Sequence, residues 1–190
     1  MRIDLKNTAL LVVDVQKGFE ATNYWGEERN NLNAEKQIEL LLKTWRNAGL
    51  PVYLVKHCSV LTKSPLHKSK AGNELMDFIN PQPGEPIIEK DVNSAFIGTT
   101  LENQLKLRKI TTVVVVGLTT DHCISTTVRM AANLGFTTIL VEDATATYNK
   151  KGTDGTNYPA QLIHDTAIAS LKDEFAQITT TKLLVELIAV

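Results

Sequence analysis

The 190-residue sequence is poor in cysteine and has no excess of charge of either sign. Only Cys58 and Cys123 occur, which excludes a disulfide framework and a cysteine-rich metal cluster. The formal net charge is -1, and acidic and basic residues are scattered rather than grouped in blocks. Such a chain has no field that would gather phosphate backbones or anionic lipid. We therefore expect neither nucleic acid nor a membrane as a partner.

Long apolar runs are also missing. No uninterrupted apolar segment approaches the ~20 residues of a membrane span, and the N-terminus leads directly into a strand pattern without an apolar signal region. A cytoplasmic location is the resulting expectation. Hydrophobic residues make up 43% and charged residues 22% of the chain, which are ordinary globular values. This length and composition predict one domain over residues 1–190 with a single active site.

Strand patterns alternate with helical patterns along the chain. Residues 8–15 and 112–118 are almost continuously apolar, as is typical of strands buried on both faces of a parallel sheet. Further strands are expected at residues 52–56, 87–90, 137–141 and 175–180, with helical spacing in the segments between them. The alternation predicts an α/β fold, a Rossmann-like, doubly wound, mostly parallel six-stranded sheet with helices on both faces. Ligands bind such sheets at the carboxyl ends of the strands.

Two chemically reactive residues lie at the ends of the apolar strand patterns. Asp14 interrupts the first pattern near its carboxyl end, where an unpaired buried carboxylate would be costly; it is either catalytic or caps a loop amide. Cys123 lies between the four-valine strand and a helix, whose start would favour a thiolate and lower the thiol pKa from ~8.5 into the range ~3.5 to 7.5. The alternative is a buried cysteine that acts as a small hydrophobe, which the polar neighbours at 119–122 fit poorly.

Lys90 is a third candidate for this site. If the first and fourth strands are neighbours, Asp14 and Cys123 face the same crevice. Lys90 follows the third strand, which in that order lies two strands from the first, a gap of roughly 10 Å that a lysine side chain could largely cover. There its charge would keep Asp14 ionised and favour the Cys123 thiolate. The alternative is an exposed lysine.

These residues resemble the isochorismatase-like hydrolase family, and within it the cysteine hydrolases of the amidohydrolase branch. The matching segments are residues 11–16 with Phe19, Lys90 with residues 94–96, and residues 116–123. The resemblance implies a Rossmann-like fold and a catalytic triad of Asp14, Lys90 and Cys123. It also implies a cis peptide bond between Leu118 and Thr119, and an oxyanion hole formed by the backbone amides of Thr119 and Cys123.

Two departures from the family narrow the chemistry. Nicotinamidases of this family bind a metal through an Asp-x-His pair, but here Val55 stands where the aspartate would be, two residues before His57. A metal-dependent nicotinamidase is therefore disfavoured, and no cofactor is expected. True isochorismate hydrolases lack the nucleophilic cysteine, so Cys123 argues against that reaction. Segments 57–59, 64–66 and 169–171, together with His164, are similar to the branch that includes streptothricin hydrolases.

The predicted function is the hydrolysis of a small, non-peptide amide through a thioester on Cys123. Candidate substrate-binding side chains are Phe19, Trp25, His57, Phe96 and His122, with core packing as the alternative for each aromatic residue. One alternative is that the same triad hydrolyses an ester, a lactam or nicotinamide. Another is that Cys123 is a redox or ligand-binding thiol that could pair with Cys58. A catalytically idle subunit is a further alternative. A homodimer or homotetramer is expected, since oligomers are common for this fold family.

Overall fold

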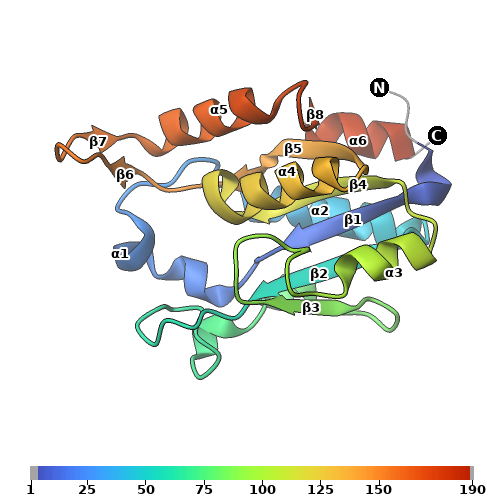
Figure 1. Cartoon of the computed structure of the whole chain (residues 1–190), viewed down its shortest axis with the longest axis horizontal. Coiled ribbons are helices and arrows are strands. Elements are labelled where there is room, and N and C mark those ends of the chain that lie inside the picture. The colour runs from blue at the N-terminus through green and yellow to red at the C-terminus, as the bar shows by residue number, and fades with distance from the viewer. Residues whose placement is uncertain (1–3, 189–190) are drawn as a thin grey trace.

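A six-stranded parallel sheet forms the centre of the computed structural model, which describes residues 4–188. The sheet has the order β3-β2-β1-β4-β5-β8, and every neighbouring pair of strands is parallel (Figure 1). The strands are β1 (Thr8–Val13), β2 (Val52–His57), β3 (Ile87–Lys90), β4 (Thr112–Leu118), β5 (Thr137–Ala146) and β8 (Gln177–Thr179). This arrangement confirms the doubly wound sheet, with β1 and β4 as neighbours and β3 two strands from β1.

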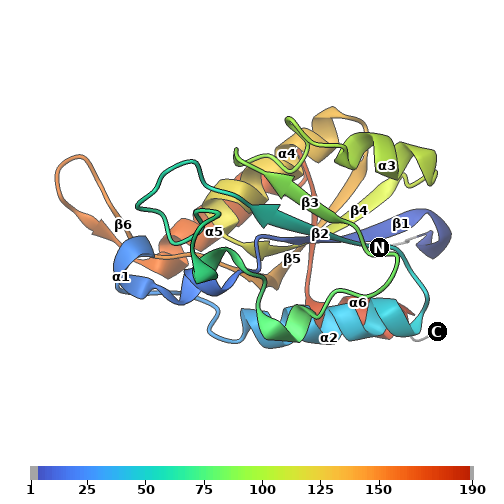
Figure 2. The same ribbon diagram turned by 90° about the horizontal axis from the view of Figure 1, so that it is seen from below.

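Helices cover both faces of the sheet. They are α1 (Thr22–Trp25), α2 (Ala34–Asn47), α3 (Leu101–Leu107), α4 (Ser125–Asn133), α5 (Ala160–Leu171) and α6 (Thr181–Ile188). Figure 2 shows α2 and α6 together on one face and α3 and α4 on the other, where α5 packs beside α4. Short 3-10 helices lie at Leu5–Asn7, Lys17–Glu20, Ala71–Asn73 and Asp77–Ile79, and a π-helical turn at Thr120–Ile124 joins β4 to α4. None of the helices between residues 4 and 188 combines the length and apolar character that crossing a bilayer requires.

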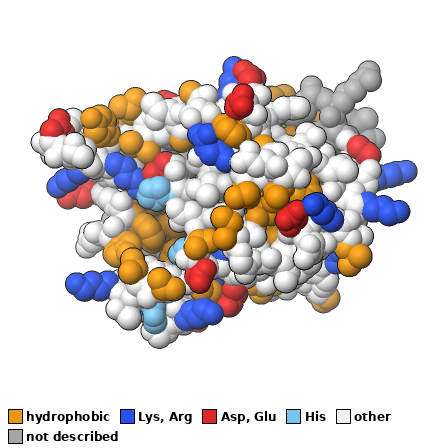
Figure 3. All heavy atoms as spheres, in the orientation of Figure 1, with side chains coloured by type: hydrophobic (Ala, Val, Ile, Leu, Met, Phe, Trp, Pro, Cys, Tyr) orange, Lys and Arg blue, Asp and Glu red, His pale blue; other side chains and the backbone are white. Residues whose placement is uncertain are grey.

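The core consists of two apolar layers, one on each side of the sheet. Successive side chains of β1 alternate between them, so that Leu10 and Val12 pack under α2 while Leu11 and Val13 pack toward α4. All six residues of β1 and all seven of β4 are buried, which explains why both strands read as continuous apolar runs. On the outer surface, acidic and basic side chains are interleaved, as the face in Figure 3 shows.

Strand β5 is longer than the sequence pattern predicted. It continues to Ala146 because the pairing with β4 shifts register between Val115 and Gly117, so that Gly117 and Leu118 pair with Thr145 and Ala146. The polar residue Asp143, which lies two residues beyond the apolar pattern, accepts hydrogen bonds from the backbone nitrogen and the hydroxyl of Thr181 at 2.8 and 3.0 Å. The carboxylate therefore caps the start of α6 and is tolerated within the strand.

A small antiparallel hairpin, β6 (Lys150–Lys151) and β7 (Asn157–Tyr158), projects between β5 and α5 (Figure 1). The sequence did not predict it. Each of its strands has only two residues, which is too short for an alternating pattern of apolar and polar side chains to be recognised.

Candidate active site

Asp14 leaves the sheet at the carboxyl end of β1. Its φ of 55° lies in the left-handed region, and its backbone nitrogen donates to the Val55 carbonyl at 2.8 Å. Strand β4 approaches the end of β1 closely here, so that a Cβ on Gly117 would lie only 1.9 Å from the Val13 carbonyl oxygen. Glycine at position 117 is therefore required for β4 to pack against the end of β1. The Asp14 side chain has no solvent exposure.

Lys90 connects the residues of the site. From the end of β3 its Nζ donates to Asp14 Oδ2 at 2.7 Å and to Cys123 Sγ at 3.3 Å. The same nitrogen lies 3.2 Å from His57 Nδ1 and 3.2 Å from the Val92 carbonyl oxygen. The sequence expectation that Asp14, Lys90 and Cys123 meet at one edge of the sheet thus agrees with the geometry.

The charge of Lys90 is stabilised by its neighbours. Burial by itself would lower the pKa of Lys90, but the Asp14 carboxylate and the Cys123 sulfur raise it, so its pKa lies above the ordinary lysine value. The side chain is fully shielded from solvent. The site therefore contains a buried ion pair between Lys90 and Asp14.

Cys123 lies in the π-helical turn before α4 and is 8% exposed. Burial raises the pKa of its thiol, the Asp14 carboxylate raises it further, and the Lys90 charge offsets only part of both effects. The expected lowering of the thiol pKa is therefore wrong. The reason is that the carboxylate and the apolar surroundings outweigh the helix start and the lysine, so the resting group is a thiol.

The metal-binding capacity of the site is limited by Lys90. Asp14, His57 and Cys123 each offer one ligand atom, and these three atoms lie within 4.8 Å of one another. However, Lys90 Nζ is within hydrogen-bonding distance of all three residues. A metal ion could be coordinated there only by displacing the ammonium group, which already supplies the positive charge.

The peptide bond between Leu118 and Thr119 is cis, at the position that the family resemblance implied. The Thr119 carbonyl accepts from the backbone nitrogens of His122 at 3.1 Å and Ile124 at 3.2 Å. The turn that carries Cys123 thus wraps around this carbonyl. Backbone amides of Thr119 and Cys123 as an oxyanion hole remain a prediction.

Phe19 and Trp25 form an aromatic cluster. Their rings stack with centroids 4.6 Å apart, and the Trp25 ring lies 6.5 Å from that of Tyr148. Two hydrogen bonds fix the cluster, from Trp25 Nε1 to the Gly18 carbonyl at 2.8 Å and from the Tyr148 hydroxyl to the Phe19 carbonyl at 2.6 Å. Phe19 is 3% exposed, so packing against Trp25 accounts for its burial. Tyr148 had no signal in the sequence.

The other three candidates differ in position. Among the described residues, His57 alone of the five candidates is within hydrogen-bonding distance of Lys90. Phe96 is buried and stacks on Phe136 with centroids 5.9 Å apart, so its ring has a packing role. The His122 side chain is 53% exposed, with Nε2 3.4 Å from Asp121 Oδ2. The His122 side chain is therefore largely in solvent, whereas Cys123 is buried.

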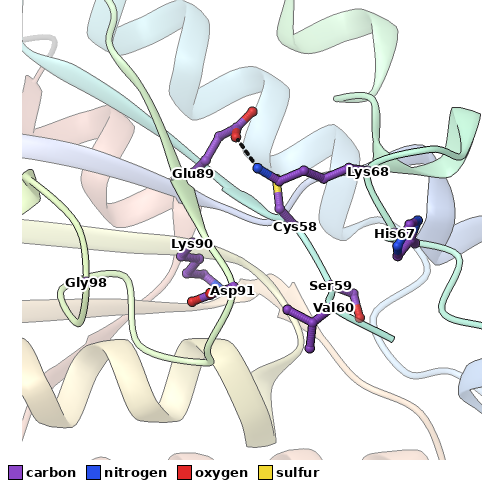
Figure 4. Close-up of a pocket in the computed structure, with 9 residues that line it drawn as sticks. All are labelled: Cys58, Ser59, Val60, His67, Lys68, Glu89, Lys90, Asp91 and Gly98. Carbon is purple, nitrogen blue, oxygen red and sulfur yellow. Dashed lines mark hydrogen bonds and ion pairs between the residues drawn. The ribbon is translucent and has the colours of Figure 1, made fainter. Parts of the chain in front are cut away.

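A pocket of about 530 Å³ lies between the carboxyl ends of β2 and β3 (Figure 4). Its lining comprises Cys58, Ser59, Val60, His67, Lys68, Glu89, Lys90, Asp91 and Gly98, so it shares Lys90 with the site but not Asp14 or Cys123. Lys68 Nζ and Glu89 Oε2 pair across it at 3.2 Å. The Cys58 thiol accepts from Asn73 Nδ2 at 3.7 Å, and neither cysteine is in a disulfide.

His164 gives the fold a predicted pH dependence. It is 4% exposed, its Nδ1 lies 3.0 Å from Thr120 Oγ1, and burial lowers its pKa. Below about pH 6.5 the unfolded chain therefore binds a proton that folded His164 does not. The free energy of unfolding should thus decrease as the pH is lowered, by up to about 1.4 kcal/mol per pH unit. Urea unfolding of wild type and His164→Gln from pH 5 to 7.5 measures this.

The His164→Gln variant should be less stable at pH 7.5 but should lose less stability on acidification. Some pH dependence will remain, because the pKa of His57 is also lowered by burial and by Lys90. An unchanged pH slope in His164→Gln would show that this histidine is not held neutral by the fold.

Comparisons with known proteins agree on the family. The model of the isochorismatase domain matches residues 8–182. YrdC of Bacillus subtilis, an uncharacterized isochorismatase family protein, is 48% identical over 93% of this chain and 94% of its own length. Nicotinamidase 3 of Arabidopsis thaliana is 30% identical over 77% of this chain and 76% of its own. A crystal structure of an isochorismatase-family protein from Chromobacterium violaceum superposes with a TM-score of 0.93 at 33% identity, covering 100% of this chain and 97% of that one. The chain therefore belongs to the isochorismatase family of hydrolases.

Proposed function

We propose that this hydrolase cleaves a small, non-peptide amide through a thioester on Cys123. The observation that carries the proposal is the contact of one ammonium group with both a carboxylate and a thiol, since Lys90 Nζ lies 2.7 Å from Asp14 Oδ2 and 3.3 Å from Cys123 Sγ. A nucleophile beside a base, with the base oriented by a third group, is the arrangement of covalent hydrolases. The relative named as a nicotinamidase supports a carbon–nitrogen bond as the target.

The resting thiol needs a base at the moment of attack, because its pKa is raised. In the proposed first half-reaction, Asp14 accepts the proton of Cys123 while the sulfur adds to the carbonyl carbon. The negative oxygen is bound by the backbone amides of Thr119 and Cys123, a contribution of about 3 kcal/mol per donor in other hydrolases. Asp14 then gives the proton to the departing amine, the carbon–nitrogen bond breaks and a thioester remains.

In the second half-reaction, Asp14 takes a proton from water, whose oxygen adds to the thioester carbonyl. The carbon–sulfur bond breaks, and the Cys123 sulfur recovers the proton from Asp14. Lys90 stays protonated throughout and keeps Asp14 anionic, in line with its raised pKa. Within this scheme Lys90 is a positioning and charge-stabilising group rather than a proton donor.

The same triad on an ester, a lactam or nicotinamide is the alternative substrate choice. Metal-assisted nicotinamide cleavage is the least favoured of these, because Val55 is buried in β2 in place of a ligand and Lys90 lies between the remaining candidate ligands. A redox role in which Cys123 pairs with Cys58 has less support, because each thiol has its own separate hydrogen-bond partner.

The homodimer or homotetramer and the cytoplasmic location stay predictions.

Acid-quenched mass spectrometry of the protein after mixing with a library of small amides tests the proposal. We expect the mass of an acyl group on the tryptic peptide of residues 110–129, in which Cys123 is the only cysteine. Ammonia or amine release should accompany it. Cys58→Ala, at the other free cysteine, is the matched control and should keep both signals. Cys123→Ala should lose both, and full turnover in that variant would refute the nucleophile.

A further inference from the structure

Asn93 is an exposed residue whose side chain reaches the nucleophile. Its Oδ1 lies 3.8 Å from Cys123 Sγ and accepts the thiol hydrogen, although no sequence pattern distinguishes this residue. Residues on both sides of Asn93 are anchored, because the Val92 carbonyl accepts from Lys90 Nζ at 3.2 Å and the Ala95 nitrogen donates to Thr127 Oγ1 at 3.1 Å. The loop after β3 therefore holds one carboxamide at the exposed side of an otherwise buried sulfur.

The hydrogen bonds of the resting thiol differ from those that the reaction needs. The Cys123 thiol donates to Asn93 Oδ1, whereas Asp14 Oδ1 is buried and has no hydrogen-bond partner among residues 4–188. A carboxylate oxygen of Asp14 nevertheless lies within 4.8 Å of the sulfur. Rotation about the Cβ–Sγ bond would thus turn the S–H bond away from Asn93 and toward Asp14. Asn93 Oδ1 would then need another hydrogen-bond donor.

The scissile amide itself can supply that donor. We propose that Asn93 Oδ1 accepts an N–H of the substrate's leaving nitrogen, and that this bond releases the Cys123 thiol hydrogen to Asp14. The inference deepens the proposed function, because it makes Asn93 a specificity-determining residue for amides that carry at least one N–H on the scissile nitrogen. Esters and tertiary amides have no such hydrogen and leave the thiol bound to Asn93.

Protection of Cys123 from alkylation tests this without requiring hydrolysis. N-Ethylmaleimide alkylates the thiol at pH 8 by addition of the sulfur to its double bond, and the rate is followed on the peptide of residues 110–129. Acetamide, which has two N–H groups, should slow modification of the wild type more than N,N-dimethylacetamide at equal concentration. In Asn93→Leu the two amides should protect equally. Equal protection by both in the wild type, including none by either, would overturn the inference.

The isosteric variant Asn93→Asp separates recognition from packing. Its carboxylate still accepts an N–H, so acetamide should remain the better protector. The added negative charge beside the sulfur should move the midpoint of the alkylation pH profile upward by about one unit or more. An Asn93→Asp profile identical to the wild type would show that the side chain at position 93 does not contact the sulfur in solution. Ile97→Ala, a 51% exposed side chain on the same loop, is the control and should change neither readout.

Turnover gives a second readout once the library yields a substrate. Asn93→Leu should lower kcat/KM for an N–H amide by about 10-fold or more, the value of one lost hydrogen bond in a substrate site. The ester with the same acyl group should change by less than about 3-fold. Equal losses for amide and ester would point to a disturbed thiol rather than a lost recognition contact. That result would overturn the specificity role and leave the triad intact.

Discussion

Replacing Asp14 by asparagine is expected to lower turnover by roughly 100- to 10,000-fold while making Cys123 easier to alkylate at neutral pH. Turnover falls because the variant has no base to accept the thiol proton. Alkylation accelerates because the Asp14 carboxylate is one of the causes that raise the pKa of the Cys123 thiol, whereas the Lys90 charge, which lowers it, remains. The two opposite changes are measured as kcat/KM for the library substrate and as the pH profile of thiol modification.

The opposite signs distinguish a catalytic base from a residue that only supports the fold. Asp165→Asn, at an exposed position on α5, is the matched control and should leave both measurements at wild-type values. General disorder in Asp14→Asn would accelerate alkylation of Cys58 as well, so the two cysteine peptides are compared in each experiment. Wild-type turnover, or slower modification of Cys123, would contradict the assignment of Asp14 as the base.

The position of the site could be predicted from the sequence because strand ends are fixed by topology. Once the strand order is that of a doubly wound sheet, the residues after β1, β3 and β4 must converge at one edge. Asp14, Lys90 and Cys123 are titratable residues at these three ends, and their side chains meet. Their meeting required no knowledge of side-chain packing, which is why strand patterns were sufficient to place them.

The thiol pKa could not be predicted in the same way, because it is a balance between opposing effects. The helix start and Lys90 were visible in the sequence, but the depth of burial and the position of the Asp14 carboxylate were not. The role of an aromatic candidate could not be decided from the sequence for a related reason. An aromatic side chain such as Phe96 fits both a pocket wall and a core, and the choice depends on whether a partner such as Phe136 lies beside it. Asn93 carried no pattern at all, since a single polar residue in a loop is ordinary.

Replacing Lys90 by methionine should cost about 3 to 5 kcal/mol of unfolding free energy, the usual result of leaving one partner of a buried ion pair without its counter-charge. Both side chains have no solvent exposure, so Asp14 would remain as an uncompensated carboxylate. The double variant Asp14→Asn with Lys90→Met removes both charges and should recover most of the lost stability. Urea unfolding of the wild type, both single variants and the double variant provides the cycle.

Lys106→Met is the appropriate control, because Lys106 pairs with Glu102 at 2.5 Å on the exposed surface of α3, where its side chain is 59% exposed. Its loss should cost less than about 1 kcal/mol, as is usual for exposed pairs. Stability of Lys90→Met equal to the wild type would mean that water reaches the site and solvates Asp14. A double variant no more stable than Lys90→Met would mean that the uncompensated Asp14 carboxylate does not cause the loss of stability. Recovery in the double variant would instead establish that the loss in Lys90→Met comes from the unpaired Asp14 carboxylate. The Lys90 charge would then be needed for stability as well as for the proposed role of Asp14 as a base.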